Sequence, residues 1–109
     1  MITHIVQLQF KSSASHDRVE EVCSSLVALK DKCLHPTRQT PYIKSFRAGK
    51  ENSPEKINNG ITHVFVMELE SEEDREYYLN KDPDHLAFVK SLGPEIEKVQ
   101  VVDFTNGVF

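Results

Sequence analysis

The hydrophobic positions of the first strand-like segment alternate with polar ones. In ITHIVQLQF (2–10), one side of an extended chain carries Ile2, His4, Val6, Leu8 and Phe10. Successive side chains of a strand point to opposite faces, so this pattern predicts a strand covered on one side. The segment ITHVFVMELE (61–70) alternates in the same way and predicts the strongest strand of the chain, with one face formed by Ile61, His63, Phe65, Met67 and Leu69.

Two other regions have the helical period, in which apolar side chains recur every three or four positions. Residues 16–33 predict one amphipathic helix, preceded by serines that are typical helix starts. The second region predicts a helix broken in two. SEEDREYYLN (71–80) begins with Ser71 as N-cap, and DPDHLAFVKSL (82–92) begins again with Asp82 as cap and Pro83 in the first turn.

The remaining segments complete the order β-α-β-β-α-β, which is the ferredoxin-like arrangement of the α+β class. We expect a loop over 34–41, a strand over 42–49, a polar connection over 50–60 with one helical turn after Ser53-Pro54, and a last strand over 96–104. The central strands carry apolar residues on both faces, such as Val64 and Val66 opposite Phe65 and Met67. Helices on one side leave the other face bare, so we predict a homodimer that buries it.

Composition adds limits to this picture. The 109 residues fit one domain, 1–109, with 39% apolar and 28% charged residues. The net charge of −4 is spread along the chain without a basic stripe, so we expect no nucleic acid and no anionic membrane as partner. Apolar runs are too short to span a membrane, and the N-terminus does not resemble a signal peptide. We therefore expect a cytoplasmic protein.

The two cysteines are expected to stay unpaired with each other. Cys23 and Cys33 fall in one predicted helix, and ten helical positions correspond to roughly 15 Å of axial rise. A disulfide needs Cα atoms within about 7 Å. We interpret both as small buried or half-buried side chains.

Three of the five histidines lie on apolar faces: His4 and His63 on strands, and His85 at the head of a stripe that includes Phe88. Two interpretations stay open. Each imidazole can be a core side chain bonded to a carbonyl group, or the three can form a polar pocket inside an apolar cavity. His16 and His35 have polar surroundings and are expected to be exposed.

Of the histidines, His85 is the one best suited to acid–base chemistry. It lies in the first turn of its helix, where the helix dipole and burial both disfavour the imidazolium form, while nearby Asp82 and Asp84 favour it. A neutral imidazole can accept a proton, and Tyr77 or Tyr78 can donate a hydrogen bond to a developing oxyanion. A metal site formed by the three histidines is an alternative that their spacing does not demand, and we predict none. No glycine-rich phosphate loop is present.

The stretches THIVQLQFK, IKSFRAGKENSPEKINNGITHVFVMELESEED and YYLNKDPDHLAFVKSLGPEIEKVQVVDF closely resemble the stress-responsive A/B barrel domain family. The resemblance covers nearly the whole chain, except the proline-containing loop around 34–41. It implies a ferredoxin-like domain that dimerises into an α+β barrel. Many members are known only as small stress-induced proteins, whereas some are enzymes without a cofactor, among them a plant polyketide cyclase and hydroxynitrile lyases.

The resemblance also assigns residues. The cyclase has an HPAH motif whose last histidine acts as base together with a preceding tyrosine. DPDH stands here, so His85 takes the base position and Asp82 replaces the first histidine of the motif. Tyr78 is the nearest match to the tyrosine, although one extra residue separates it from His85, and Tyr77 is the alternative.

Of the other residues in the cyclase pocket, some have a match in this sequence and one is replaced. His4 and His63 match pocket-lining histidines, and Leu26 replaces a pocket tyrosine. The substrate-binding set that we predict is therefore His4, His63, Tyr77 and Phe88, beside the catalytic His85 and Tyr78.

Three functions are compatible with these residues. The first is a homodimeric stress-associated protein with an internal pocket for a small organic ligand. The second is a cofactor-free enzyme that cyclises or cleaves a small oxygenated molecule through His85. The third is a monooxygenase on the same dimeric barrel, which the family resemblance favours least.

Overall fold

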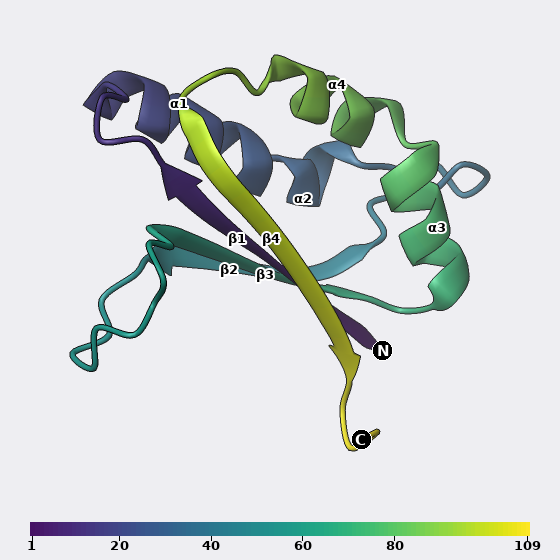
Figure 1. The fold of residues 1–109 in the computed structure, drawn as a ribbon. Helices are drawn as coiled ribbons and strands as arrows, with labels where there is room; N and C mark the ends of the chain where they lie inside the picture. Colours follow the sequence, from purple (N-terminus) through teal and green to yellow (C-terminus); the bar gives the residue numbers. More distant parts are fainter.

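The computed structural model describes all residues 1–109, and its elements follow the predicted order. They are β1 (Ile2–Phe10), α1 (His16–Val27), α2 (Leu29–Lys32), β2 (Ile43–Lys50), β3 (His63–Leu69), α3 (Glu72–Asn80), α4 (Pro83–Ser91) and β4 (Ile96–Thr105). The strands form one antiparallel sheet in the order β2-β3-β1-β4. All helices lie on one side of it (Figure 1). The predicted ferredoxin-like α+β fold is confirmed.

The strand register determines which side chains face the helices. On β1, His4 pairs with Met67 of β3 and with Asp103 of β4. The residues predicted to share the covered faces of β1 and β3 include the most buried positions of both strands, as the alternation requires. The core joins these positions to the inner faces of the helices and consists of Leu8, Phe10, Val22, Leu26, Leu29, Cys33, Tyr42, Ile43, Phe65, Met67, Leu69 and Tyr78.

The predicted helix starts are confirmed by their caps. The Ser15 and Ser71 hydroxyls accept hydrogen bonds from main-chain amides three residues later, at 3.1 Å in each case. The Asp82 carboxylate accepts from the Asp84 amide at 2.9 Å and from the His85 amide at 3.4 Å. These bonds satisfy amides that have no partner within their own helix. Asp82 therefore fixes where α4 starts and, with it, the position of His85.

The expected single helix over 16–33 is wrong in detail. The chain turns at Ala28, which separates α1 from the one-turn helix α2. Cys33 lies just after α2 in an extended conformation and is fully buried, as are Leu26 and Leu29 before it. The turn allows these three side chains to pack into the same core although they do not share one straight helical face. Both cysteines are free, as predicted.

Two further expectations are corrected. No helical turn follows Ser53-Pro54, because the Glu51 carboxylate accepts a hydrogen bond from the Ser53 amide and holds a plain turn there. His35 is not exposed. Its side chain is only 19% accessible, packs edge-on against Tyr42, and accepts from the amides of Thr37 and Arg38.

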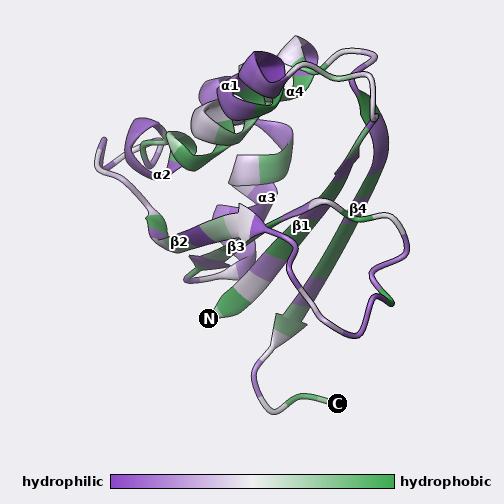
Figure 2. Ribbon diagram, turned by 90° about the vertical axis from the view of Figure 1, so that its left-hand side faces the viewer, coloured by the Kyte–Doolittle hydropathy of each residue, from purple (hydrophilic) through white to green (hydrophobic).

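The far face of the sheet carries no helix or strand (Figure 2). Hydrophobic residues on this face are half-exposed or exposed, which matches the expectation of a bare apolar surface. None of the helices combines the length and the hydrophobicity that a membrane span requires.

Candidate functional site

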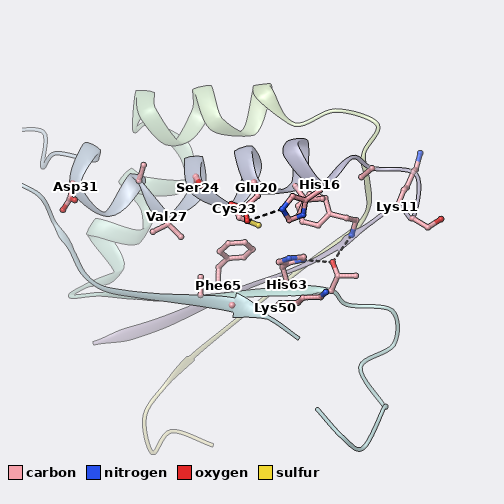
Figure 3. A pocket seen from close by; sticks show the side chains of 18 residues that line it. Lys11, His16, Glu20, Cys23, Ser24, Val27, Asp31, Lys50, His63 and Phe65 are labelled. Atoms are coloured by element: carbon pink, nitrogen blue, oxygen red, sulfur yellow. Dashed lines mark hydrogen bonds and ion pairs between the residues drawn. The ribbon is translucent and has the colours of Figure 1, made fainter. Parts of the chain in front are cut away.

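An open pocket of about 930 Å³ lies between α1 and the sheet (Figure 3). Its size is within the range of small-molecule sites. The apolar part of its lining includes Phe10 and Phe65 from the sheet and Val19 and Val27 from α1. Charged and titratable side chains of both signs also line it: Lys11, His16, Glu20, Asp31, Lys50 and His63. The pocket combines an apolar wall with a few polar groups, as binding sites for organic molecules do.

His63 is the one predicted site residue that lines this pocket. Its Nδ1 atom lies 2.9 Å from the hydroxyl of Thr62, and its ring stands edge-on to Phe10 at a centroid distance of 5.1 Å. Burial lowers the pKa of His63 below its ordinary value of 6.5, and the positive charge of Lys50 on the adjacent strand lowers it further. His63 is therefore a neutral imidazole at physiological pH.

The other two inward histidines meet at Tyr78, away from this pocket. The ring of Tyr78 lies 4.0 Å from that of His85, tilted by 30°, and 6.0 Å from that of His4 in an edge contact. Tyr78 is 1% exposed and His4 is 2% exposed, whereas His85 is half-buried and forms the outer member of the cluster. Burial raises the pKa of Tyr78 and lowers that of His85, which leaves both groups neutral.

The two histidines of this cluster have opposite surroundings. His4 Nδ1 lies 2.7 Å from the carboxylate of Asp103, which also binds Arg75 of α3 at 3.1 Å. His85 Nδ1 is buried and has no hydrogen-bond partner at all. A carboxylate stabilises a protonated imidazole, whereas an unpartnered buried nitrogen disfavours protonation. The positive form of His4 lowers the pKa of His85 further, after the larger effect of burial. The cluster is thus suited to keep His85 neutral as an acceptor.

Asp82, at the position of the first histidine of the cyclase motif, has a structural role in this geometry. It is 1% exposed and accepts a hydrogen bond of 2.6 Å from the hydroxyl of Tyr42, besides the two amides of α4. Burial raises the pKa of Tyr42, and the bond to Asp82 adds to the effect. A buried carboxylate is stable when it has several donors, so Asp82 joins β2 to the start of α4.

The three inward histidines therefore do not share one site. Met67, the partner of His4, and His63 are four residues apart on β3, which places His4 and His63 about 13 Å apart along the strands. Buried Phe65 and its register partner Val6 lie between them. The chain holds no group of three or more histidine, cysteine or acidic side chains placed to bind a metal ion.

The two remaining predicted residues lie at the edge of the core. Tyr77 packs edge-on against Tyr42 at 5.7 Å, so Tyr78, not Tyr77, faces His85. Phe88 is half-buried against the core. Sequence reasoning missed Asp103, Thr62 and Tyr42. For Asp103 a signal existed, because an acid shares the inward face of the last strand with Val99 and Val101.

Comparison with known proteins gives the same fold and a family. The curated stress-response A/B barrel domain-containing protein HS1 of Arabidopsis thaliana is 28% identical over 103 residues, which cover 94% of this chain and 87% of HS1. The structure of a hydroxynitrile lyase from Passiflora edulis superposes with a TM-score of 0.82 at 24% identity, covering 99% of this chain and 95% of the lyase.

A Thermobifida fusca structure described as a dimeric ferredoxin-like protein of unknown function gives a TM-score of 0.71 at 23% identity. The match covers 94% of this chain and 88% of that protein. At these identities the two structures support the fold alone. The model of the stress responsive A/B barrel domain matches residues 2–106. The chain therefore belongs to the stress-responsive A/B barrel domain family.

Proposed function

We propose that the protein binds a small, largely apolar organic molecule in the pocket between α1 and the sheet, and that it does so as a homodimer. The observation that carries the ligand part is the pocket itself, which is open, about 930 Å³ in volume and lined by two phenylalanines. Aromatic and aliphatic walls bind ring-shaped ligands by burying apolar surface.

Filling the pocket tests this proposal. Ala48 lies on β2 opposite Phe65 and lines the pocket, so Ala48→Phe places a ring in the space above Phe65. We expect naphthol, followed by its fluorescence, to bind the native protein and to bind Ala48→Phe at least tenfold more weakly. Ala87→Phe, on the exposed surface of α4, is the matched control and should bind as the native protein does. Equal binding by Ala48→Phe would place the ligand elsewhere.

The homodimer is supported by the bare face of the sheet. Ile5 lies in register between Val66 and Val102, so the three form a continuous apolar row across β3, β1 and β4. Val102 and Phe104 remain 46% and 49% exposed in the single chain. A second copy with the same row buries both faces, as in a closed two-fold dimer. The dimeric Thermobifida fusca protein of the same fold fits this arrangement.

A second candidate function is acid–base catalysis by His85, which one observation favours. A buried imidazole nitrogen without a partner, next to a tyrosine ring, is unusual for a purely structural histidine. In this proposal His85 removes the proton of a substrate hydroxyl and Tyr78 donates to the substrate oxygen. His85 is half-buried, whereas Tyr78 and His4 are buried, so in this proposal a substrate reaches Tyr78 only when the α3–α4 layer opens.

An aromatic cyanohydrin tests this second candidate. Removal of its hydroxyl proton by His85 breaks the bond to the cyano carbon, and cyanide leaves while an aldehyde remains. We expect aldehyde release by the native protein and loss of most of it, about 100-fold or more, in His85→Phe. Release at the buffer rate by both proteins would contradict this role for such substrates, and equal enzymatic release by both would exclude His85 as the base.

A further inference from the structure

The hydrogen bonds around Thr62 determine which nitrogen of His63 carries a proton. The Thr62 hydroxyl oxygen lies 3.1 Å from the Phe10 amide, 3.1 Å from the Leu8 carbonyl and 2.9 Å from His63 Nδ1. A hydroxyl has one proton to donate and two lone pairs that accept. The carbonyl can only accept and the amide can only donate. When all three contacts are hydrogen bonds, the remaining lone pair accepts from His63, and Nδ1 carries the proton.

This arrangement leaves Nε2 of the neutral His63 ring as an acceptor directed at the pocket. No group of the protein forms a hydrogen bond with Nε2. The atom is also not buried, because His85 Nδ1 is the sole buried side-chain N or O atom without a partner. His63 projects from the sheet into the pocket beside Phe65 (Figure 3). The pocket therefore presents one fixed acceptor next to an apolar wall.

We propose that the ligand of this pocket is a neutral molecule with a ring-sized apolar body and a hydroxyl group that donates to His63 Nε2. This inference rests on the proposed ligand-binding function and adds the chemical class of the ligand. A carbonyl or ether oxygen at the same place would face a lone pair and form no bond. Thr62 is then a positioning residue. It selects the tautomer of His63 but does not itself bond the hydroxyl group of the ligand.

The charges around the pocket support a neutral ligand. Lys11 and Lys50 are balanced by Glu20 and Asp31, so the lining has no excess of either sign. Across the pocket, His16 lies 3.9 Å from the Glu20 carboxylate and is 84% exposed. The lowered pKa of His63, caused first by burial and then by Lys50, keeps Nε2 unprotonated at neutral pH. An anionic ligand would gain little here from a pocket with balanced charges.

A pair of ligands that differ in one proton tests the inference. Naphthol and its methyl ether share the ring body, but the ether cannot donate. At pH 7.5 we expect the native protein to bind naphthol about fivefold to tenfold more tightly than the ether, the usual contribution of one hydrogen bond. In His63→Phe the preference should fall to about onefold, while the ether keeps its affinity. His35→Gln, in the loop between α2 and β2, should keep the native preference.

The outcomes separate this inference from the proposed function. Equal binding of both compounds by the native protein overturns the hydroxyl requirement and leaves the pocket proposal intact. Binding of neither compound contradicts the pocket proposal itself. Independently of any ligand, nitrogen NMR of the native protein should show His63 with Nδ1 protonated and Nε2 unprotonated. A proton found on Nε2 would overturn the inference whatever the binding data are, and Thr62→Val should release the tautomer preference.

Discussion

A buried imidazole nitrogen without a partner distinguishes His85 from the other side chains of the molecule. The Nδ1 atom is fully buried, and the neighbouring ring of Tyr78 offers contact but no hydrogen bond. Leaving a polar atom in this state opposes folding, because the atom loses its bonds to water. An aromatic ring without nitrogen would keep the stacking and remove that penalty. The Nδ1 atom of His85 therefore lowers the stability of the folded protein.

The stability of His85→Phe is a direct measure of this argument. We expect its free energy of unfolding at pH 7.5 to equal that of the native protein or to exceed it by up to about 1 kcal/mol. Chemical denaturation monitored by circular dichroism gives the value. A loss of more than about 2 kcal/mol would mean that the nitrogen is bonded in the folded protein or that the larger ring does not fit. His85→Leu, which is smaller, separates these two causes.

The same variant also changes the pH dependence of folding. The folded-state pKa of His85 lies below 6.5, mainly through burial and then through His4, while the main chain of Tyr78 and the carboxylate of Asp82 oppose the shift. The unfolded chain therefore takes up a proton first as the pH falls below about 6.5. The native protein should lose stability from pH 6.5 downward more steeply than His85→Phe. Parallel curves between pH 7.5 and 5 would contradict the lowered pKa.

At the scale of elements, one buried carboxylate connects two parts of the chain that are distant in sequence. The Asp82 carboxylate caps α4 by accepting a hydrogen bond from the main-chain amide of Asp84. It also accepts a hydrogen bond from the hydroxyl of Tyr42, which immediately precedes β2. Because α4 starts at Pro83, this junction sets the height of His85 above the sheet. A second junction of the same kind joins α1 to the start of β4, where the Arg18 guanidinium binds the Glu95 carboxylate and the Ser91 carbonyl. In both cases a polar group joins a helix to the start of a strand that is distant in sequence.

Removing one hydroxyl tests the first junction. Tyr42→Phe takes away a donor from a fully buried carboxylate, so we expect unfolding to become easier by about 1–3 kcal/mol. Tyr77→Phe is the matched control, because its hydroxyl is not bonded to Asp82 and its ring packs against Tyr42. Denaturant titration of both variants at neutral pH is sufficient. A similar decrease in the free energy of unfolding in the two variants would mean that the hydrogen bond to Asp82 does not stabilise the fold.

At the scale of the whole molecule, the sheet separates two different surfaces. The helix-covered face contains the core, the pocket and the histidine cluster. The opposite face has no covering element (Figures 1 and 2). In the dimer that we propose, the pocket stays on the outer, helix side of each subunit. Ligand binding and dimer formation should therefore respond to different substitutions.

A charge at the centre of the bare face tests the dimer. Val66 lies on β3 in register with Ile5, so Val66→Lys places an ammonium group in the middle of the apolar row. Burying that charge twice in one interface is unfavourable, and we expect the variant to be monomeric by light scattering. Val89→Lys, on the exposed surface of α4, should remain dimeric. A monomeric native protein at micromolar concentration would contradict the proposal.

The sequence by itself determined the elements and their order. The period of two predicted β1 and β3, the period of three to four predicted the main helices, and the caps Ser71 and Asp82 marked the break between α3 and α4. These signals are local: a cap or a periodic face depends on residues within a few positions of one another. The turn at Ala28 and the end of α2 were not predicted, because packing into the core, not local preference, sets them.

Only the tertiary structure decided which side chains meet. His4 and Asp103 are 99 residues apart and form a bond because β1 and β4 are neighbours with one particular register. The same register separates His63 from His4, and the turn of α3 places Tyr78, not Tyr77, on His85. The alternation of a strand tells which face a residue takes, but the distance between two residues on that face depends on strand order and register. The sequence therefore indicated the histidines, and the fold divided them between the pocket at His63 and the cluster around Tyr78.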